Sequence, residues 1–509
     1  MDSEKPFLYL SLPTCLSLGR PAGRLIRGEN LMSNHHPIIG LEIHIQLKTK
    51  SKMFCTCDND IENKQANENI CPICLGHPGV LPAINKKAVE WTVLTGLALN
   101  CVIPKETKFD RKNYFYPDLP KGYQISQYDM PIAVNGSLEI NNHKIRIKRV
   151  HLEEDAAKNL HAEDKSYSLV DYNRGGTPLM EIVTEPDIIS PEEAGSFLRE
   201  LRLIMRYLGV SNADMEKGEL RCDANVNIKL GNSKTPIVEI KNLNSFKMVE
   251  RALAYEIERQ IDEFAVLKKQ KGKVTRGWDD RKGITREQRV KEEAHDYRYF
   301  AEPDLPPLRL KKIREAMQAK MPELPFEREK RFKEEYGLGP EDISALVNNK
   351  ALGDYYEEVV SEAAAENSNQ KVYKLAANWV VTELQKLLRL NKIGVSHLKI
   401  TPENFAEFIN IVSRGEINSS VAQIVLKEMF ERGADPSQVI TEKNLGQVSN
   451  TEELDVIINE VIKENPKPVE DFKSGNEKTL MFLVGQVMRK TGGKANPQVV
   501  QDLFRKKLI

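Results

Sequence analysis

The chain has 509 residues, a length that suits about three domains. Its 74 Lys and Arg residues balance 74 Asp and Glu residues, so a globally basic nucleic-acid-binding protein is excluded, and a nucleic-acid partner would need local basic patches. No apolar run reaches the length of a transmembrane helix.

Residues 1–35 differ in composition from the rest of the chain. Phe7–Leu18 is apolar, but the acidic residues Asp2 and Glu4 precede it, where a secretory signal carries positive charge. We interpret residues 1–35 as a disordered N-terminal extension. A mis-assigned start before Met32 and organelle targeting are the alternatives.

Four cysteines form two close pairs, Cys55 with Cys57 and Cys71 with Cys74, separated by the polar residues 58–70. Two such pairs can bring four thiolates to one point, which is the ligand set of a tetrahedral zinc site. A four-thiolate site has no open position, so the pattern predicts structural zinc in a zinc-ribbon insertion. Four unrelated buried cysteines are the alternative.

Strict alternation predicts a strand over residues 38–47. Its odd-numbered positions from Ile39 to Leu47 are apolar and share one face, whereas Glu42, His44 and Gln46 share the other. A carboxylate and an imidazole so placed can hold one metal ion, although a solvated polar face would show the same pattern.

Further strands are predicted over residues 221–228 and 238–241. Between these strands and the first one, Ser190 is the N-cap of a helix, with Pro191 at its first position and Glu193 closing a capping box. Sheet and helix therefore alternate to about residue 305.

After residue 305 the strand patterns fade and the periodicity is helical. The sequence thus predicts an α+β fold in which a mixed-sheet cradle domain, with the zinc-ribbon insertion, covers residues 36–305. A helical domain covers 306–400, and a helical tail covers 401–509.

Two acidic segments accompany the first strand. His151–Asp155 is a cluster of acids, and Glu181 is a carboxylate within the apolar run 178–183. A buried carboxylate is costly unless it is paired or metal-bound. Oxygen ligands with one imidazole suit Mg²⁺ or Mn²⁺, and Mg²⁺ is commonly held together with the phosphates of ATP.

The chain has no Walker-type loop and no Gly-x-Gly-x-x-Gly motif, so a sheet face would have to hold the nucleotide. An ordinary exposed polar face is the alternative. The residues of suitable character are Arg221, Asp223, Asn225, Lys241 and Asn242.

Taken in order, a series of motifs resembles the B subunits of aspartyl/glutamyl-tRNA amidotransferases, from about residue 36 to the C-terminus. The motifs are Gly40–Leu47, Phe109–Asp118, His151–Lys158, Asn173–Asp187, Leu220–Asn225, Lys241–Phe246, Asp296–Phe300 and Phe482–Met488.

This resemblance implies a ligase. In that family the B subunit uses ATP to phosphorylate the side-chain carboxylate of Glu-tRNA(Gln) or Asp-tRNA(Asn), and ammonia then displaces phosphate to give the amide. A glutaminase A subunit supplies the ammonia, and a small C subunit completes a heterotrimer. Phosphorylation replaces oxide with a better leaving group, and Mg²⁺ neutralises charge between the approaching anions.

The resemblance also implies the site residues. Zinc would stabilise the cradle, and the tail would contact tRNA, in line with six basic residues against one acidic residue in 486–509. The choice of Glu154 over Glu153 rests on the resemblance alone. The Mg²⁺ ligands would be Glu42, His44, Glu154 and Glu181, and Asp110, Lys112 and Tyr114 would lie beside the route of ammonia.

A rival interpretation is a zinc-ribbon RNA-binding module without catalysis. It explains the cysteines and the basic segments, but not the carboxylates in apolar settings, which repel RNA unless a cation is present. We expect a bacterial cytoplasmic protein, with an organelle matrix as the alternative location.

Overall fold

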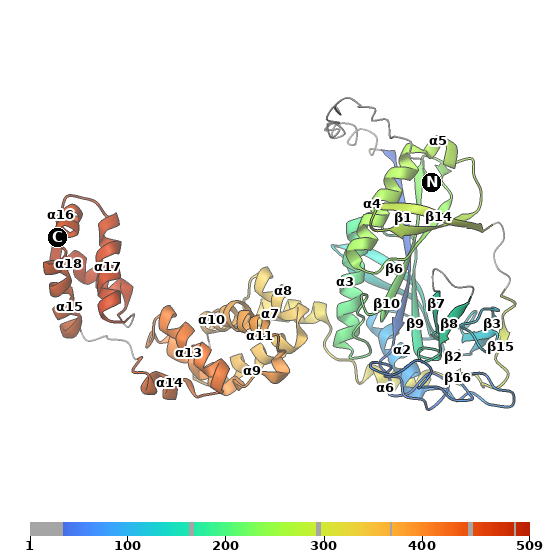
Figure 1. Cartoon of the computed structure of the whole chain (residues 1–509), viewed down its shortest axis with the longest axis horizontal. Coiled ribbons are helices and arrows are strands. Elements are labelled where there is room, and N and C mark those ends of the chain that lie inside the picture. The colour runs from blue at the N-terminus through green and yellow to red at the C-terminus, as the bar shows by residue number, and fades with distance from the viewer. Residues whose placement is uncertain are drawn as a thin grey trace, which may run out of the picture. The chain divides into compact units, whose positions relative to one another are not determined.

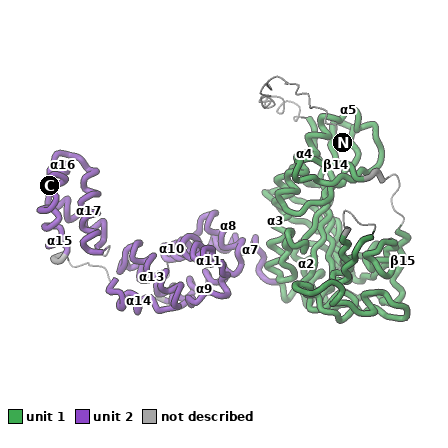
Figure 2. The backbone as a smooth tube through the Cα atoms, viewed as in Figure 1, with its two compact units in different colours: residues 1–321 green, residues 322–509 purple. Residues whose placement is uncertain are grey.

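The computed structural model describes residues 34–508, except 162–166, 292–296, 367–368, 446–450 and 493–494. Most of the predicted N-terminal extension, and Asp296 of the predicted family motifs, lie outside the described residues. The chain divides into two compact units, Met1–Met321 and Pro322–Ile509, which Figure 2 shows in different colours.

A nine-stranded sheet forms the frame of unit 1 (Figure 1). Its order is β14-β13-β12-β10-β1-β9-β6-β5, with β11 beside β10, and among the described pairs only β12 and β13 run parallel. The bounds are His36–Gln46 (β1), Ala133–Ile140 (β5), His143–Glu154 (β6), Pro178–Thr184 (β9), Leu220–Leu230 (β10), Ser233–Lys234 (β11), Ile237–Lys241 (β12), Lys273–Asp279 (β13) and Ile284–Lys291 (β14).

Three small sheets accompany the large one, in the orders β15-β3-β4, β16-β2 and β7-β8. Figure 1 shows β3, β7, β8 and β15 on the right of the large sheet and the helices α3 and α4 on its left. The strand bounds are Glu106–Thr107 (β2), Asp110–Asn113 (β3), Tyr123–Ser126 (β4), Lys158–His161 (β7), Ser168–Asp171 (β8), Phe300–Ala301 (β15) and Leu308–Arg309 (β16).

The helices of unit 1 cover the apolar side of the sheet. Helices α3 and α4 pack against each other, and α4 lies against β10. The alternation predicted for the first strand is confirmed, since Ile39, Leu41 and Ile43 are at most 1% exposed. The helix bounds are Lys86–Ala98 (α2), Pro191–Tyr207 (α3), Phe246–Asp262 (α4), Phe264–Leu267 (α5) and Lys311–Gln318 (α6).

The start of α3 follows the sequence prediction, except that the Glu193 carboxylate caps the backbone N of Ile189, one residue before the N-cap. Ser190 is the N-cap, and its hydroxyl accepts a hydrogen bond from the backbone N of Glu193 at 3.1 Å. The Glu193 carboxylate accepts from the backbone N of Ile189 at 2.8 Å, and its other oxygen lies 2.6 Å from His143 Nδ1. The carboxylate therefore ties the helix to β6 as well as capping it.

The described part of unit 2 consists of helices and turns, so the predicted sequence of a mixed sheet followed by helices is confirmed. Among the described helices, none is long and apolar enough to cross a membrane. The four last helices enclose a core of their own that includes Leu454, Leu483 and Phe504. The bounds are Pro325–Glu335 (α7), Pro340–Asn348 (α8), Lys350–Glu366 (α9), Gln370–Asn378 (α10), Trp379–Leu384 (η2), Gln385–Asn391 (α11), Val395–His397 (η3), Pro402–Ser413 (α12), Ser419–Arg432 (α13), Pro436–Glu442 (α14), Thr451–Glu464 (α15), Pro466–Lys473 (α16), Lys478–Lys490 (α17) and Pro497–Leu508 (α18).

A buried carboxylate joins the two parallel strands. Glu239 on β12 is 5% exposed and accepts hydrogen bonds from Lys273 Nζ at 2.9 Å and Thr275 Oγ1 at 3.0 Å, both on β13. Burial alone would raise the pKa of Glu239, but Lys273 and Lys241 outweigh it and lower the pKa to about 2. The ionised form therefore holds β13 against β12.

We expect Glu239→Gln to lower the free energy of unfolding by about 2 kcal/mol at neutral pH, because hydrogen bonds to a charged group are lost. The folded-state pKa is depressed, so the loss should be full above the usual pKa of 4.5 and should disappear as the pH falls toward about 2. Urea denaturation of both proteins over a pH series measures this. Glu258→Gln, at an exposed position of α4, is the control. A difference that does not change with pH would contradict the prediction.

Candidate active site

The polar face of β1 continues across its neighbours. The strand register places His44 beside Arg221 of β10 on one side and beside Glu181 of β9 on the other. Glu181 in turn lies beside His151 of β6. Because directly opposed residues of antiparallel strands share a face, four strands contribute to one row of ionisable side chains.

Glu181 is the centre of this row. Its Oε2 lies 3.3 Å from Nε2 of His44 and 3.3 Å from Nε2 of His151, and the residue is 5% exposed. Glu42 Oε1 and Glu153 Oε1 lie 4.0 Å and 3.9 Å from His44 Nε2. We call Glu42, His44, His151, Glu153 and Glu181 the carboxylate cluster.

The donor atoms of the carboxylate cluster form two overlapping sets. One set is Glu42, His44 and Glu181, and the other is His151, Glu153 and Glu181, with the ligand atoms of each set within 4.8 Å of one another. Carboxylate oxygens with imidazole nitrogens fit a divalent cation such as Mg²⁺ or Mn²⁺. The shared residue, Glu181, would belong to both sets.

The charges in the cluster are strongly coupled. Burial would raise the pKa of Glu181, but His151 and His44 hold it well below its usual range. Burial would lower the pKa of His151, but Glu181 and Glu153 raise it to about 9. The pKa of Glu42 is raised, chiefly by burial and by Glu181. A cation among these acids would relieve their mutual repulsion.

The structure places Glu154 outside the carboxylate cluster, unlike the other three predicted ligands, Glu42, His44 and Glu181. Successive residues of a strand point to opposite faces, and Glu153 is the one that shares a face with His151. Glu154 forms an ion pair with Lys121, and its Oε1 accepts a hydrogen bond from the backbone N of Ile125 at 2.9 Å. The alternation of residues 151 and 153 was the sequence signal that could have identified Glu153.

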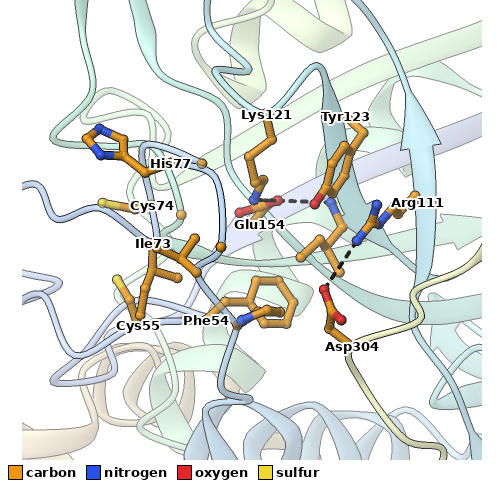
Figure 3. A pocket seen from close by; sticks show the side chains of 16 residues that line it. Phe54, Cys55, Ile73, Cys74, His77, Arg111, Lys121, Tyr123, Glu154 and Asp304 are labelled. Carbon is orange, nitrogen blue, oxygen red and sulfur yellow. Dashed lines mark hydrogen bonds and ion pairs between the residues drawn. The ribbon is translucent and has the colours of Figure 1, made fainter.

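Glu154 instead lines a cavity of about 210 Å³. Figure 3 shows the ion pair of Glu154 with Lys121 inside it, with Cys55 and Cys74 on one side and Arg111 and Asp304 on the other. The wall of this cavity therefore carries both signs of charge among apolar side chains such as Phe54 and Ile125.

The four cysteines predicted to form a metal site converge. The Sγ atoms of Cys55, Cys57, Cys71 and Cys74 all lie within 4.8 Å of one another, so this cluster can bind zinc. The backbone N of Cys71 donates to Cys74 Sγ at 3.1 Å. Hydrogen bonding from Cys55 lowers the pKa of Cys74 to about 5, and the nearby ammonium of Lys52 acts in the same direction. A thiolate is the form that binds a metal.

The residues predicted to hold a nucleotide lie mostly on the same polar face. Arg221 Nη2 lies 2.6 Å from Asp155 Oδ2, and Lys241 forms an ion pair with Asp223. Arg221 Nε and Asn225 Oδ1 are buried, and the described residues offer them no hydrogen-bond partner. Unsatisfied buried polar atoms beside a cluster of acids suit a ligand. Asn242, which follows at the end of β12, lines another pocket with Gly277 and Trp278.

The residues predicted to lie beside the ammonia route are on or next to β3. Burial would lower the pKa of Lys112, but Glu153 and Tyr299 raise it above its usual range. Its Nζ lies 5.0 Å from the ring centroid of Tyr297. Asp110 is 1% exposed and accepts a hydrogen bond from the backbone N of Tyr128 at 3.0 Å. The Tyr114 ring packs 6.2 Å from that of Tyr297.

Comparisons with known proteins give the family. The family model described as "GatB/GatE catalytic domain" matches residues 37–315, and the one described as "GatB domain" matches residues 354–508. This chain belongs to the GatB/GatE family. The family predicted from the motifs is thereby confirmed, and the chain is the B component of an amidotransferase, which is a ligase.

The similarity extends along nearly the whole chain. A protein of Carboxydothermus hydrogenoformans is 47% identical over 94% of this chain and 99% of its own length. A protein of Thermotoga maritima is 47% identical over 93% of this chain and 99% of its own length. A protein of Thermomicrobium roseum is 48% identical over 92% of this chain and 98% of its own length. All three are named as the B component of an aspartyl/glutamyl-tRNA(Asn/Gln) amidotransferase.

We expect the purified GatB chain to carry about one zinc ion per molecule, because a four-thiolate set binds one ion. Cys74→Ser should lose most of that zinc, whereas Cys101→Ala, at a buried cysteine outside the cluster, should keep it. Elemental analysis after dialysis measures the content. Equal zinc in both variants would contradict the prediction.

Proposed function

We propose that this GatB chain activates the side-chain carboxylate of Glu-tRNA(Gln), Asp-tRNA(Asn) or both, and that ammonia then converts the activated group to the amide. The relatives' name, which pairs the acids Asp and Glu with tRNA(Asn/Gln), supports this substrate class. The observation that carries the proposal is the carboxylate cluster, since buried acids and imidazoles of this kind suit Mg²⁺-dependent phosphoryl transfer.

The reaction has two steps. A carboxylate oxygen of the aminoacyl side chain attacks the γ-phosphorus of ATP, the bond to the bridging oxygen breaks, and ADP leaves. Ammonia then attacks the carbonyl carbon of the acyl phosphate, inorganic phosphate leaves, and the amide remains after loss of a proton. Each step needs two reactants held close together in a site that limits access of water.

The carboxylate cluster would hold Mg²⁺ in its two overlapping donor sets, with Glu42, His44 and Glu181 in the first set and His151, Glu153 and Glu181 in the second. Bound there, Mg²⁺ would neutralise charge on phosphoryl oxygens. The imidazoles keep Glu181 ionised even though it is buried, and a metal ion bound by the cluster would displace the protons that the imidazoles carry.

The nucleotide would lie on the neighbouring part of the polar face. Arg221 and Asn225 support this placement, because each keeps a buried polar atom that no described residue satisfies. Asp223 and Lys241 form the ion pair beside Glu42 on this face, and Asn242 follows at the end of the strand. This arrangement replaces the phosphate-binding loop that the chain lacks.

Ammonia would reach the site from a glutaminase A subunit, with a small C subunit completing a heterotrimer; the relatives' designation as one lettered component of an enzyme supports the existence of further components. Lys112 supports a route past β3, because Glu153 is the largest of the charges that raise its pKa, and Asp110 and Tyr114 are its neighbours on that segment. The cavity beside Glu154 would be a second part of the same route.

We extend the proposal to the chain as a whole. Residues 36–305 would form the catalytic cradle, stabilised by zinc at the four cysteines, residues 306–400 a helical domain, and residues 401–509 a tail that contacts tRNA through basic side chains. The protein would act in the bacterial cytoplasm, in keeping with its bacterial relatives.

We expect the complex with its partner subunits to release phosphate from ATP in the presence of Mg²⁺, ammonium and Glu-tRNA or Asp-tRNA. His44→Ala should slow this release by about 10²–10³-fold, because it removes a cluster ligand beside the reacting oxygens. Unchanged release in the variant would remove Glu42 and His44 from the active site. The absence of any tRNA-dependent release by the wild type would favour the RNA-binding module.

Adjacent glutamates give a sharper test of the ligand set. With ammonium as nitrogen donor, Glu153→Gln should lower the rate by about 10²-fold or more, whereas Glu154→Gln should retain it within about tenfold, because Glu154 faces the cavity and not the cluster. With glutamine as nitrogen donor, Glu154→Gln should lower the rate by a larger factor than it does with ammonium. The reverse order with ammonium would restore Glu154 to the metal site.

A further inference from the structure

An irregularity in β6 changes which side chains reach the polar face. Ile147 pairs with Thr184 of β9, but Arg149 pairs with Val183, so β6 has one extra residue at this point. Ile145 and Ile147 are fully buried before the extra residue, and Val150 and Leu152 are fully buried after it. The inward positions therefore change from odd to even numbers, as expected at a β-bulge.

The bulge places Arg149 on the polar face, together with His151 and Glu153. Without it, the alternation of Ile145 and Ile147 would direct residue 149 into the apolar core. An arginine turned out of the core by a bulge lies beside the carboxylate cluster, and bulges that re-aim a side chain are common next to active sites.

Arg149 lies against Glu181 without a close bond. Its Nη2 is 3.7 Å from Glu181 Oε1, and its side chain is 32% exposed. Its Nε is buried, and the described residues give it no hydrogen-bond partner. A guanidinium with a buried donor left unsatisfied, but with part of its surface exposed, can take up a ligand.

Two other cations on this face are held more tightly. Arg221 lies 2.6 Å from Asp155, and Lys241 forms ion pairs with Asp223 and Glu239. Arg149 is thus the more available guanidinium beside the cluster. Its planar group presents parallel N–H donors, which match the two oxygens of a carboxylate or of a phosphoryl group.

We propose that Arg149 binds the oxyanion that reacts at the carboxylate cluster, through its Nε and one Nη. That oxyanion is either the transferring phosphoryl group of the nucleotide or the side-chain carboxylate of the aminoacyl group, which share this chemistry. The inference rests on the proposed function and adds to it a substrate-binding residue.

The test uses the reconstituted complex with ammonium as nitrogen donor and follows phosphate release while ATP and Glu-tRNA are varied separately. Arg149→Met should lower kcat/KM about 100-fold, and Arg149→Lys should recover part of the loss, since an ammonium keeps the charge but not the paired donors. A raised KM for ATP, with weaker binding of a non-hydrolysable ATP analogue, assigns the phosphoryl group. A raised KM for Glu-tRNA with unchanged analogue binding assigns the carboxylate.

Arg146→Met is the matched control. Arg146 lies on β6 before the bulge, is 62% exposed and makes two hydrogen bonds to Asp187 at 2.8 Å and 2.7 Å. It should leave both KM values and kcat unchanged. Thermal unfolding of each variant complex separates a loss of substrate binding from a loss of structure.

Two outcomes would overturn the role of Arg149. One is kinetics of Arg149→Met within about threefold of wild type, because a paired guanidinium at the reacting oxyanion is worth more than that. The other is an equal loss in the Lys and Met variants together with a lower unfolding temperature, which indicates a structural role. Wild-type release that needs no mischarged tRNA would instead overturn the proposed function, so the two failures are distinguishable.

Discussion

The pairing of β1 with β9 and β10 is the constraint on which the candidate site depends. A slip of one residue would exchange the two faces of β1 and move His44 and Glu42 into the apolar layer. Burying one large apolar side chain contributes about 1.5–3 kcal/mol, and the odd positions of β1 from Ile39 to Ile45 are all buried. Their sum exceeds the cost of crowding a few partly compensated acids on the other face, so the core fixes the register and the register then places Glu181 between two imidazoles.

The chain tolerates such a site because its buried carboxylates have partners. Glu181 and Glu153 are nearly buried, and a buried carboxylate without a partner would be strongly destabilising. Each has an imidazole within 4 Å, and Glu153 also accepts a hydrogen bond from Ser126 at 2.9 Å. The partners hold the carboxylates ionised and oriented, which is the preorganisation that the proposed phosphoryl transfer requires.

The sequence predicted those parts of the site that depend on local pattern. Strict alternation was enough to place Glu42 and His44 on one face of a strand, and close spacing was enough to predict the convergence of four cysteines. The position of Arg149, in contrast, depends on where β6 gains an extra residue against β9. That point is set by pairing between two segments that are distant in the sequence, so no window along β6 alone contains it.

The same strand links the carboxylate cluster to the cavity beside the cysteines. Glu153 and Glu154 are joined by one peptide bond, yet Glu153 lies 3.6 Å from His151 in the cluster and Glu154 pairs with Lys121 in the cavity. The cavity wall also includes Cys55 and Cys74, so folding of the cysteine loop around a metal would fix the space into which Glu154 extends. A shift of Glu154 must move the backbone that carries Glu153, because the two residues are consecutive in the part of β6 that pairs with β9. The four cysteines can therefore support the site through β6 without contributing a ligand to it.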